Sequence, residues 1–244
     1  MLAHDASPDT RQKIENYLYW LKERGLAHAA LLTQESREAA THNTSASATA
    51  AAPHNGREAA THNTTEKYSL KSAIHCNACS LEAARPGVSW GLGPENADVL
   101  FIGDHPTREA ASINKPFYGP EWDLLTKITA AMKLHDRCYF MNIIQCPLTP
   151  EPGKLAQSFT ACEPFIRHRI DSIRPKVLVF LGKDAAENFL AARKDPLFMG
   201  VLDTKGHWPF VITHHPREML ATPALKRASW QAFQKVMQYV AMEP

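Results

Sequence analysis

The sequence predicts an α/β fold in which helices cover both faces of a parallel sheet. Four short runs are continuously apolar, which is the pattern of parallel strands that are buried on both sides. These runs cover residues 98–103, 138–143, 176–182 and 209–213. Stretches of helical length and spacing lie between and after them, at 121–134, 155–173, 184–193 and 223–242. This alternation of strand and helix indicates a doubly wound sheet.

The composition excludes several classes of protein. The chain has 244 residues, of which 44% are hydrophobic and 21% charged, as in ordinary globular proteins. The net charge of +2 is too small to indicate a nucleic-acid partner by itself. No apolar run reaches the roughly 18 residues of a membrane span, and the first residues lack the features of a secretory signal. We therefore expect a cytoplasmic protein without a disulfide framework.

The first 66 residues differ from the rest. Residues 7–25 carry helix start and end signals and an apolar stripe, which predict a short amphipathic helix. The octapeptide REAATHNT at 37–44 recurs identically at 57–64. The side chains of this segment are mostly small or polar, so they cannot bury enough apolar area to offset the conformational entropy lost on folding. We expect three parts: an N-terminal helical appendage (1–32), a flexible duplicated linker (33–66) and an α/β domain (67–244).

Polar side chains follow the predicted strands at their carboxyl ends. Gly103, Asp104 and His105 follow the first strand, Asn142 ends the second, and His215 follows the fourth. Since parallel sheets bind ligands at this edge, we expect a carboxylate, an amide and imidazoles to converge on one cleft. Each of them taken singly could instead be a helix cap or a loop hydrogen bond. Their joint occurrence favours a functional site.

Cysteine spacing is an independent signal. Cys76 and Cys79 form a C-x2-C pair, while Cys146 and Cys162 are separated by 15 residues. Four thiolates can hold a tetrahedral zinc ion or an iron–sulfur cluster. The wide second spacing is less typical of zinc ribbons. Cys138 lies inside a predicted strand and is interpreted as a buried apolar residue.

These motifs resemble the family 4 uracil-DNA glycosylases and, more broadly, the uracil-DNA glycosylase superfamily. The likeness covers residues 75–234, through HCNACSL, ADVLFIGDHP, NKPFYGPEWDLL, YFMNIIQCP, ACEPFI, RPKVLVFLG and THHPREML. It implies a three-layer α/β/α fold with a four-stranded parallel sheet, in a monomer that excises uracil from single- or double-stranded DNA. The resemblance also implies a 4Fe–4S cluster, with zinc as the alternative. Its ligands would be Cys76, Cys79, Cys146 and Cys162.

The resemblance implies a role for each strand-end residue. Phe117 of PFYG would stack on a flipped base, Asn142 would read the uracil edge, and His215 would stabilise the departing uracil anion. The backbone N–H groups of the loop that begins at Gly103 would help to stabilise this anion. The residues corresponding to those that reach the DNA, with an apolar tip that fills the space of the extruded base, are Arg217, Met219 and Leu220.

The first loop departs from the family pattern. Family members commonly read G-E-A-P-G followed by an acidic pair, whereas this chain reads GDHPT and later has Ala110 and Ala111. In the related family 1 enzymes the position of His105 is an Asp that orients the attacking water. We therefore expect Asp104 or His105 to activate the water here. The alternatives are a catalytically weakened paralogue that binds DNA or another partner, and a metal-binding structural protein.

Overall fold

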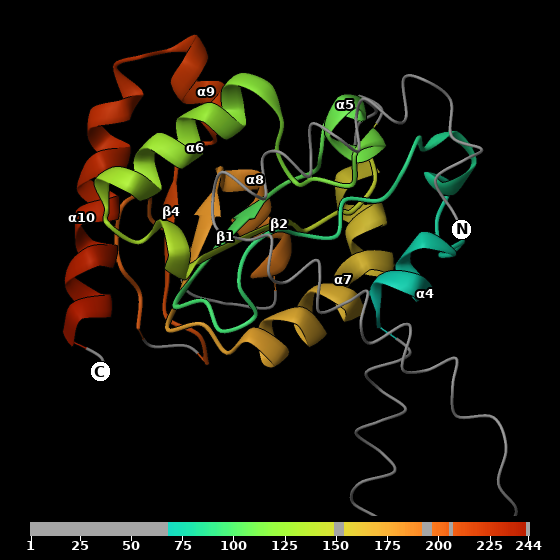
Figure 1. Cartoon of the computed structure of the whole chain (residues 1–244), viewed down its shortest axis with the longest axis horizontal. Coiled ribbons are helices and arrows are strands. Elements are labelled where there is room, and N and C mark those ends of the chain that lie inside the picture. The colour runs from blue at the N-terminus through green and yellow to red at the C-terminus, as the bar shows by residue number, and fades with distance from the viewer. Residues whose placement is uncertain (1–67, 149–153, 192–196, 205–206, 243–244) are drawn as a thin grey trace, which may run out of the picture. The chain divides into compact units, whose positions relative to one another are not determined.

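A four-stranded parallel sheet forms the centre of the protein (Figure 1). The structure is a computed structural model that describes residues 68–148, 154–191, 197–204 and 207–242, so the expected N-terminal helix and duplicated linker lie outside the described residues. The strands are β1 (Val99–Gly103), β2 (Cys138–Asn142), β3 (Val177–Leu181) and β4 (Phe210–Thr213). They lie in the order β2-β1-β3-β4, and every neighbouring pair is parallel.

The helices occupy the stretches between the strands. They are α4 (Leu70–Ile74), α5 (Arg108–Ser112), α6 (Gly119–Ala131), α7 (Lys154–Ile173), α8 (Lys183–Phe189), α9 (Pro216–Ala221) and α10 (Leu225–Met242). Two 3-10 turns are η1 (Glu82–Ala84) and η2 (His135–Arg137). The four long predicted helices are therefore found within a few residues of their expected ends, whereas the short α4, α5 and α9 were not predicted.

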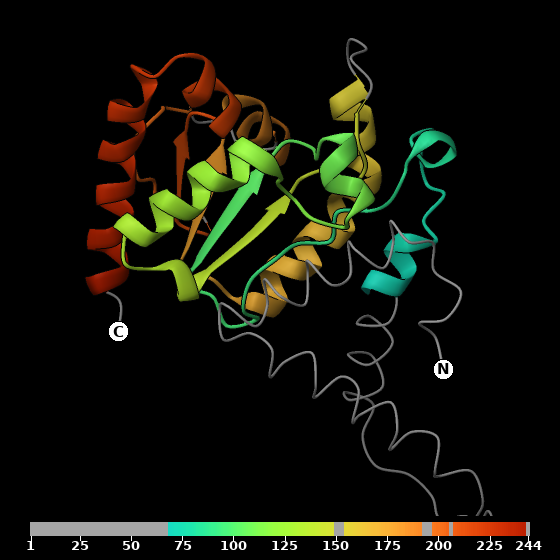
Figure 2. The same ribbon diagram turned by 45° about the horizontal axis from the view of Figure 1, so that its top comes forward.

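The sheet is the middle layer of three. Every strand residue is buried, which explains why each strand reads as a continuous apolar run. Alternate residues of β1 point to opposite faces: Leu100 and Ile102 pack with α7 and α8, while Val99 and Phe101 pack with α6 and α10. Figure 2 shows α6 and α10 on one side of the strands and α7 on the other. The expected three-layer α/β/α fold is confirmed.

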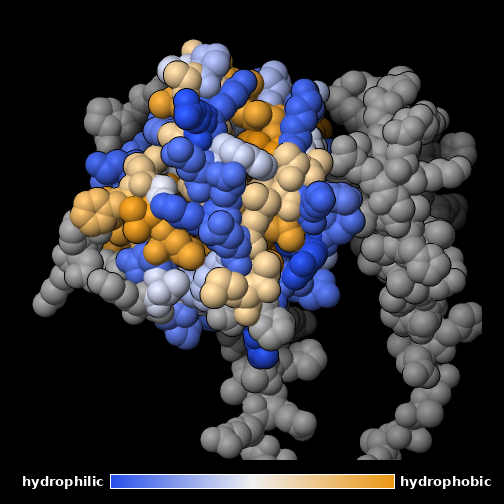
Figure 3. All heavy atoms as spheres, turned by 90° about the vertical axis from the view of Figure 1, so that its left-hand side faces the viewer, coloured by the Kyte–Doolittle hydropathy of each residue, from blue (hydrophilic) through white to orange (hydrophobic). Residues whose placement is uncertain are grey.

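Figure 3 shows the face of the protein that α10 borders. Hydrophobic side chains occur there in separate groups between hydrophilic ones (Figure 3). In the part of the chain that the structure describes, no helix is both long and apolar enough to cross a membrane.

Candidate active site

Three residues meet at the carboxyl edge of the sheet. Gly103 and Asn142 are register partners at the ends of β1 and β2. A Cβ atom at Gly103 would lie 2.4 Å from Asn142 Oδ1 and 2.8 Å from Phe117 Cζ, closer than real Cβ atoms come to other atoms. The side chains of Asn142 and Phe117 are only 1% and 2% exposed. Glycine at 103 therefore allows the amide and the aromatic ring to approach the strand end together.

The amide of Asn142 has a fixed orientation. Its Nδ2 donates a hydrogen bond of 2.8 Å to the carbonyl oxygen of Pro116, and a carbonyl can only accept. This leaves Oδ1 buried without a hydrogen-bond partner. A buried acceptor without a partner costs about 1–3 kcal/mol, and such groups are rare in native proteins. Asn142 thus presents a free acceptor that a ligand with an N–H group would satisfy.

His215 presents a free donor. It is the N-cap of α9, where its Nδ1 accepts a hydrogen bond of 3.2 Å from the backbone N–H of Arg217. Its own backbone N–H donates to Glu218 at 2.7 Å, which completes a capping box. Because Nδ1 accepts, the neutral ring carries its proton on Nε2. That Nε2 is buried without a hydrogen-bond partner, and the ring centre lies 6.0 Å from that of Phe117.

Burial keeps His215 uncharged. It lowers the pKa of the imidazole to about 4, an effect that the nearby carboxylate of Asp104 opposes and the charge of Arg217 reinforces. At neutral pH the ring is therefore a neutral N–H donor rather than a cation.

The first loop brings Asp104 and His105 to the same place. Asp104 Oδ1 lies 3.5 Å from His215 Nε2 and accepts a hydrogen bond of 2.7 Å from the backbone N–H of His105. The ring of His105 has Nδ1 3.2 Å from the carbonyl oxygen of Pro106. Because a carbonyl only accepts, Nδ1 carries the proton and Nε2 of the neutral ring is left as an acceptor. This Nε2 lies 3.8 Å from Asp104 Oδ2.

Arg217, which the resemblance predicts to reach DNA, contacts two carboxylates in the structure. Its Nη1 donates to Asp104 Oδ2 at 3.1 Å, and its Nε donates to Glu121 Oε1 at 3.3 Å. Glu121 lies in the first turn of α6, and burial raises the pKa of its carboxyl. Glu121 is not among the residues predicted from sequence, because an acidic residue in the first turn of a helix is an ordinary feature.

Of the two apolar residues predicted to form the tip, only Leu220 is exposed. Leu220 is 38% exposed, whereas Met219 is 1% exposed and belongs to the interior of the protein. Neighbouring residues of a helix point about 100° apart, so α9 turns Met219 inward and Leu220 outward. The prediction that Met219 reaches DNA does not agree with this placement.

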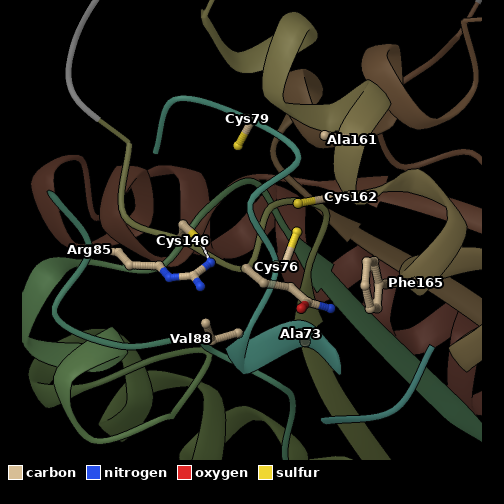
Figure 4. Close-up of a pocket in the computed structure, with 10 residues that line it drawn as sticks. Ala73, Cys76, Cys79, Arg85, Val88, Cys146, Ala161, Cys162 and Phe165 are labelled. Carbon is tan, nitrogen blue, oxygen red and sulfur yellow. Dashed lines mark hydrogen bonds between the residues drawn. The ribbon is translucent and has the colours of Figure 1, made fainter. Parts of the chain in front are cut away.

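Four cysteines line one pocket. Cys76 and Cys79 follow α4, Cys146 lies four residues after Asn142, and Cys162 belongs to α7. Their side chains surround one pocket (Figure 4), which they line together with Ala73, Arg85, Val88, Gln145, Ala161 and Phe165. All five cysteines are free thiols. The fifth, Cys138, is buried in β2 as expected, and its thiol donates to the carbonyl oxygen of Leu134 at 2.9 Å.

The chemistry of the cysteine pocket fits a metal group. Burial raises the pKa of Cys162 to about 12 and also raises that of Cys146, although Arg85 opposes the second shift by donating to Cys146 Sγ at 3.6 Å. The donor set itself fits a metal group, because four thiols around one pocket can bind zinc or an iron–sulfur cluster as thiolates. Among the described residues, no three Cys, His, Asp or Glu side chains are close enough to hold a single metal ion.

The fold and the site define an α/β protein with buried polar residues gathered at the carboxyl edge of its parallel sheet and a pocket lined by four cysteines. The sequence model of the uracil DNA glycosylase superfamily matches residues 90–239, and the chain belongs to this superfamily. The resemblance inferred from the motifs is thereby confirmed.

Curated relatives give the comparison more detail. The chain is 25% identical over 178 residues to the type-4 uracil-DNA glycosylase of Archaeoglobus fulgidus, which covers 68% of this chain and 89% of the relative. It is 27% identical over 180 residues to the type-4 enzyme of Sulfurisphaera tokodaii, covering 68% and 80%. For the type-4 enzyme of Thermotoga maritima the values are 27% over 178 residues, covering 69% and 91%.

Proposed function

We propose that the protein is a DNA repair glycosylase that hydrolyses the N-glycosidic bond of uracil in DNA. The observation that carries this proposal is the pair of buried polar atoms without partners, Asn142 Oδ1 and His215 Nε2, both near Phe117. Uracil has an N3–H donor that the first can accept and a carbonyl oxygen that the second can bind. The remaining N–H of the Asn142 amide suits uracil O4, whereas cytosine presents the opposite pattern of donors and acceptors.

The target base has to leave the helix before it can bind. Its anomeric carbon is shielded in a duplex, and extrusion costs a few kcal/mol, least in single strands and mismatches. Stacking on Phe117 and hydrogen bonds to Asn142 would recover part of this cost. Leu220, an exposed large apolar residue of α9, would fill the space that the base leaves.

Bond cleavage leaves a uracil anion and positive charge on the sugar. The neutral His215 can donate its Nε2–H to the uracil oxygen on which negative charge develops, and its proton stays on the ring. A single preorganised donor of this kind is worth about 3–4 kcal/mol of barrier. The backbone N–H groups of the Gly103 loop would add to this stabilisation, apart from that of His105, which already donates to Asp104.

His105 is the better candidate for activating the water. Both oxygens of Asp104 already accept hydrogen bonds, one from the backbone N–H of His105 and one from Arg217. The Nε2 of His105 is an acceptor without such a bond, so it can take a proton from water. The carboxylate of Asp104, 3.8 Å away, would then stabilise the imidazolium.

The cysteine pocket would hold the 4Fe–4S cluster. Each thiolate of such a cluster binds a different iron, so its four ligands stand farther apart than the ligands of one zinc ion. The resemblance of the motifs to the family 4 enzymes, together with the type-4 names of the curated relatives, supports the cluster over zinc. Hydrolysis moves no electrons, so the group would serve to join the segment of Cys76 and Cys79 to that of Cys146 and Cys162.

A direct assay tests the proposed activity. Purified protein is incubated with a labelled oligonucleotide that contains one deoxyuridine, and abasic sites are then cleaved with alkali. We expect cleavage at deoxyuridine and none in a matched oligonucleotide with deoxycytidine. Retarded migration of the DNA without cleavage would contradict the proposal and favour the binding paralogue.

A further inference from the structure

A single guanidinium joins three parts of the site. Arg217 at the start of α9 donates through Nη1 to Asp104, in the loop after β1, and through Nε to Glu121, in the first turn of α6. The carboxylates of Asp104 and Glu121 are mostly buried, and the Arg217 side chain is partly so. The bridge therefore ties α6 and α9 to the loop that carries His105.

The charges of this bridge depend on one another. Burial and the negative charge of Asp104 both raise the pKa of Glu121, whereas Arg217 and His105 lower it. Arg217 is thus the cation that opposes the effect of burial on Glu121. These bonds engage Nη1 and Nε and hold the guanidinium against the two carboxylates.

We propose that Glu121 is a positioning residue that holds Arg217 against Asp104 and so fixes the His105 loop for catalysis. This inference rests on the proposed glycosylase function. Hydrogen bonds connect Arg217 to the His105 loop through Asp104. Asp104 accepts from Arg217 through Oδ2 and from the backbone N–H of His105 through Oδ1. Glu121 would act only through Arg217, and Arg217 would serve the loop rather than the DNA backbone.

A double-mutant cycle tests whether the two residues act as one unit. Single-turnover rates of uracil release are measured for the wild type, Glu121→Ala, Arg217→Ala and the double variant. We expect each single variant to be slower by about 10- to 100-fold at saturating enzyme, as when catalytic groups are misplaced. The double variant should be no slower than Arg217→Ala alone. Effects that multiply in the double variant would overturn the proposal.

Two further variants separate positioning from a general loss of structure. Glu121→Gln keeps an oxygen that can accept from Arg217 Nε, so it should be faster than Glu121→Ala. Asp123→Ala removes an exposed carboxylate two residues along the same helix and should match the wild type. A Gln variant as slow as the Ala variant, or an equal loss in Asp123→Ala, would overturn the inference.

Salt dependence distinguishes the bridge from a phosphate contact. The affinity of each protein for an undamaged oligonucleotide is measured over a range of salt concentrations. Loss of one phosphate contact lowers the slope of log K against log salt by about 0.7–0.9. We expect the same slope in Arg217→Ala as in the wild type. A reduction of that size would assign Arg217 to the DNA and overturn its positioning role.

One readout does not depend on activity. The Arg217 Nε–H resonance, assigned by its loss in Arg217→Ala, should exchange slowly with water in the wild type and quickly in Glu121→Ala. Equal protection in both proteins would overturn the bridge, whatever the glycosylase assay gives. If the wild type releases no uracil, the proposed function fails by itself, and this resonance still tests the contact.

Discussion

His215 Nε2 and Asp104 Oδ1 face each other at 3.5 Å, although they follow different strands of the sheet. The other ring nitrogen of His215 is bound to the backbone of its own helix, so the ring cannot turn away. An N–H donor and a carboxylate are thus held side by side at one strand edge. The first suits a departing anion, and the second suits a developing cation.

The pKa of His215 predicts a specific loss of stability in acid. The folded value of about 4 lies below the ordinary value of 6.5, so between these values the unfolded chain binds a proton that the folded chain does not. The contribution of the neutral His215 ring to the free energy of unfolding is fully present above pH 6.5. It falls as the pH drops toward 4, by about 2 kcal/mol from pH 7 to pH 5.

Melting temperatures at pH 7 and pH 5 check this. The wild type should lose roughly 4–8 °C more than His215→Gln, which cannot titrate. Equal losses in the two proteins would show that His215 does not resist protonation.

Replacing Gly103 should disturb the site more than the fold. Gly103→Ala places a methyl group within 2.4 Å of Asn142 Oδ1 and 2.8 Å of Phe117 Cζ, so the amide or the ring has to move. Overpacking of this kind costs about 1–3 kcal/mol. We expect a folded protein whose uracil release, measured well below its melting temperature, is at least about 100-fold slower. A wild-type rate would mean that these two side chains tolerate displacement.

The cysteines provide a matched pair of variants. Cys162→Ser should abolish the brown colour and the absorbance near 400 nm that the family resemblance leads us to expect, because it removes one of the four thiols of the pocket. Cys138→Ala should keep both, since Cys138 is bound to Leu134 in another part of the core. Absorbance and iron content are measured on the purified proteins. Zinc instead of iron, or equal loss in both variants, would contradict the proposed cluster.

Leu220 should matter for duplex DNA in particular. A filler of vacated space is needed only where a base leaves a stack, so Leu220→Ala should slow excision from a duplex more than from a single strand. Met242→Ala is the control, because Met242 is also an exposed apolar residue on a helix of this chain. Rates are compared for the same sequence with and without its complement. An equal slowing on both substrates would argue against this role.

The sheet could be predicted from sequence because its signal is local. Each strand is buried along its whole length, and the observed strand β3, Val177–Leu181, differs from the predicted run 176–182 by one residue at each end. The short helices were missed for the opposite reason. Helix α9 has six residues, and its start depends on His215 and Glu218 forming a capping box, which becomes evident only in three dimensions.

Site residues could be predicted from sequence only where their position after a strand or within a family motif marks them individually. Asn142 and His215 follow apolar strands and match family motifs, so they could be found from the chain alone. The proposed role of Glu121 depends on its contact with Arg217, which lies 96 residues away in the sequence. No local sequence pattern links the two residues. The placement of Met219 likewise depends on how α9 rotates against the core.

The rate of uracil release by the wild type and by His215→Ala tests the central claim most directly. Free uracil is measured in single turnover at neutral pH, with circular dichroism to establish that both proteins are folded. We predict that the wild type releases uracil and that His215→Ala is slower by about 100- to 1,000-fold, because one preorganised donor is lost. A folded His215→Ala that matches the wild type, or a wild type that releases no uracil, would contradict it.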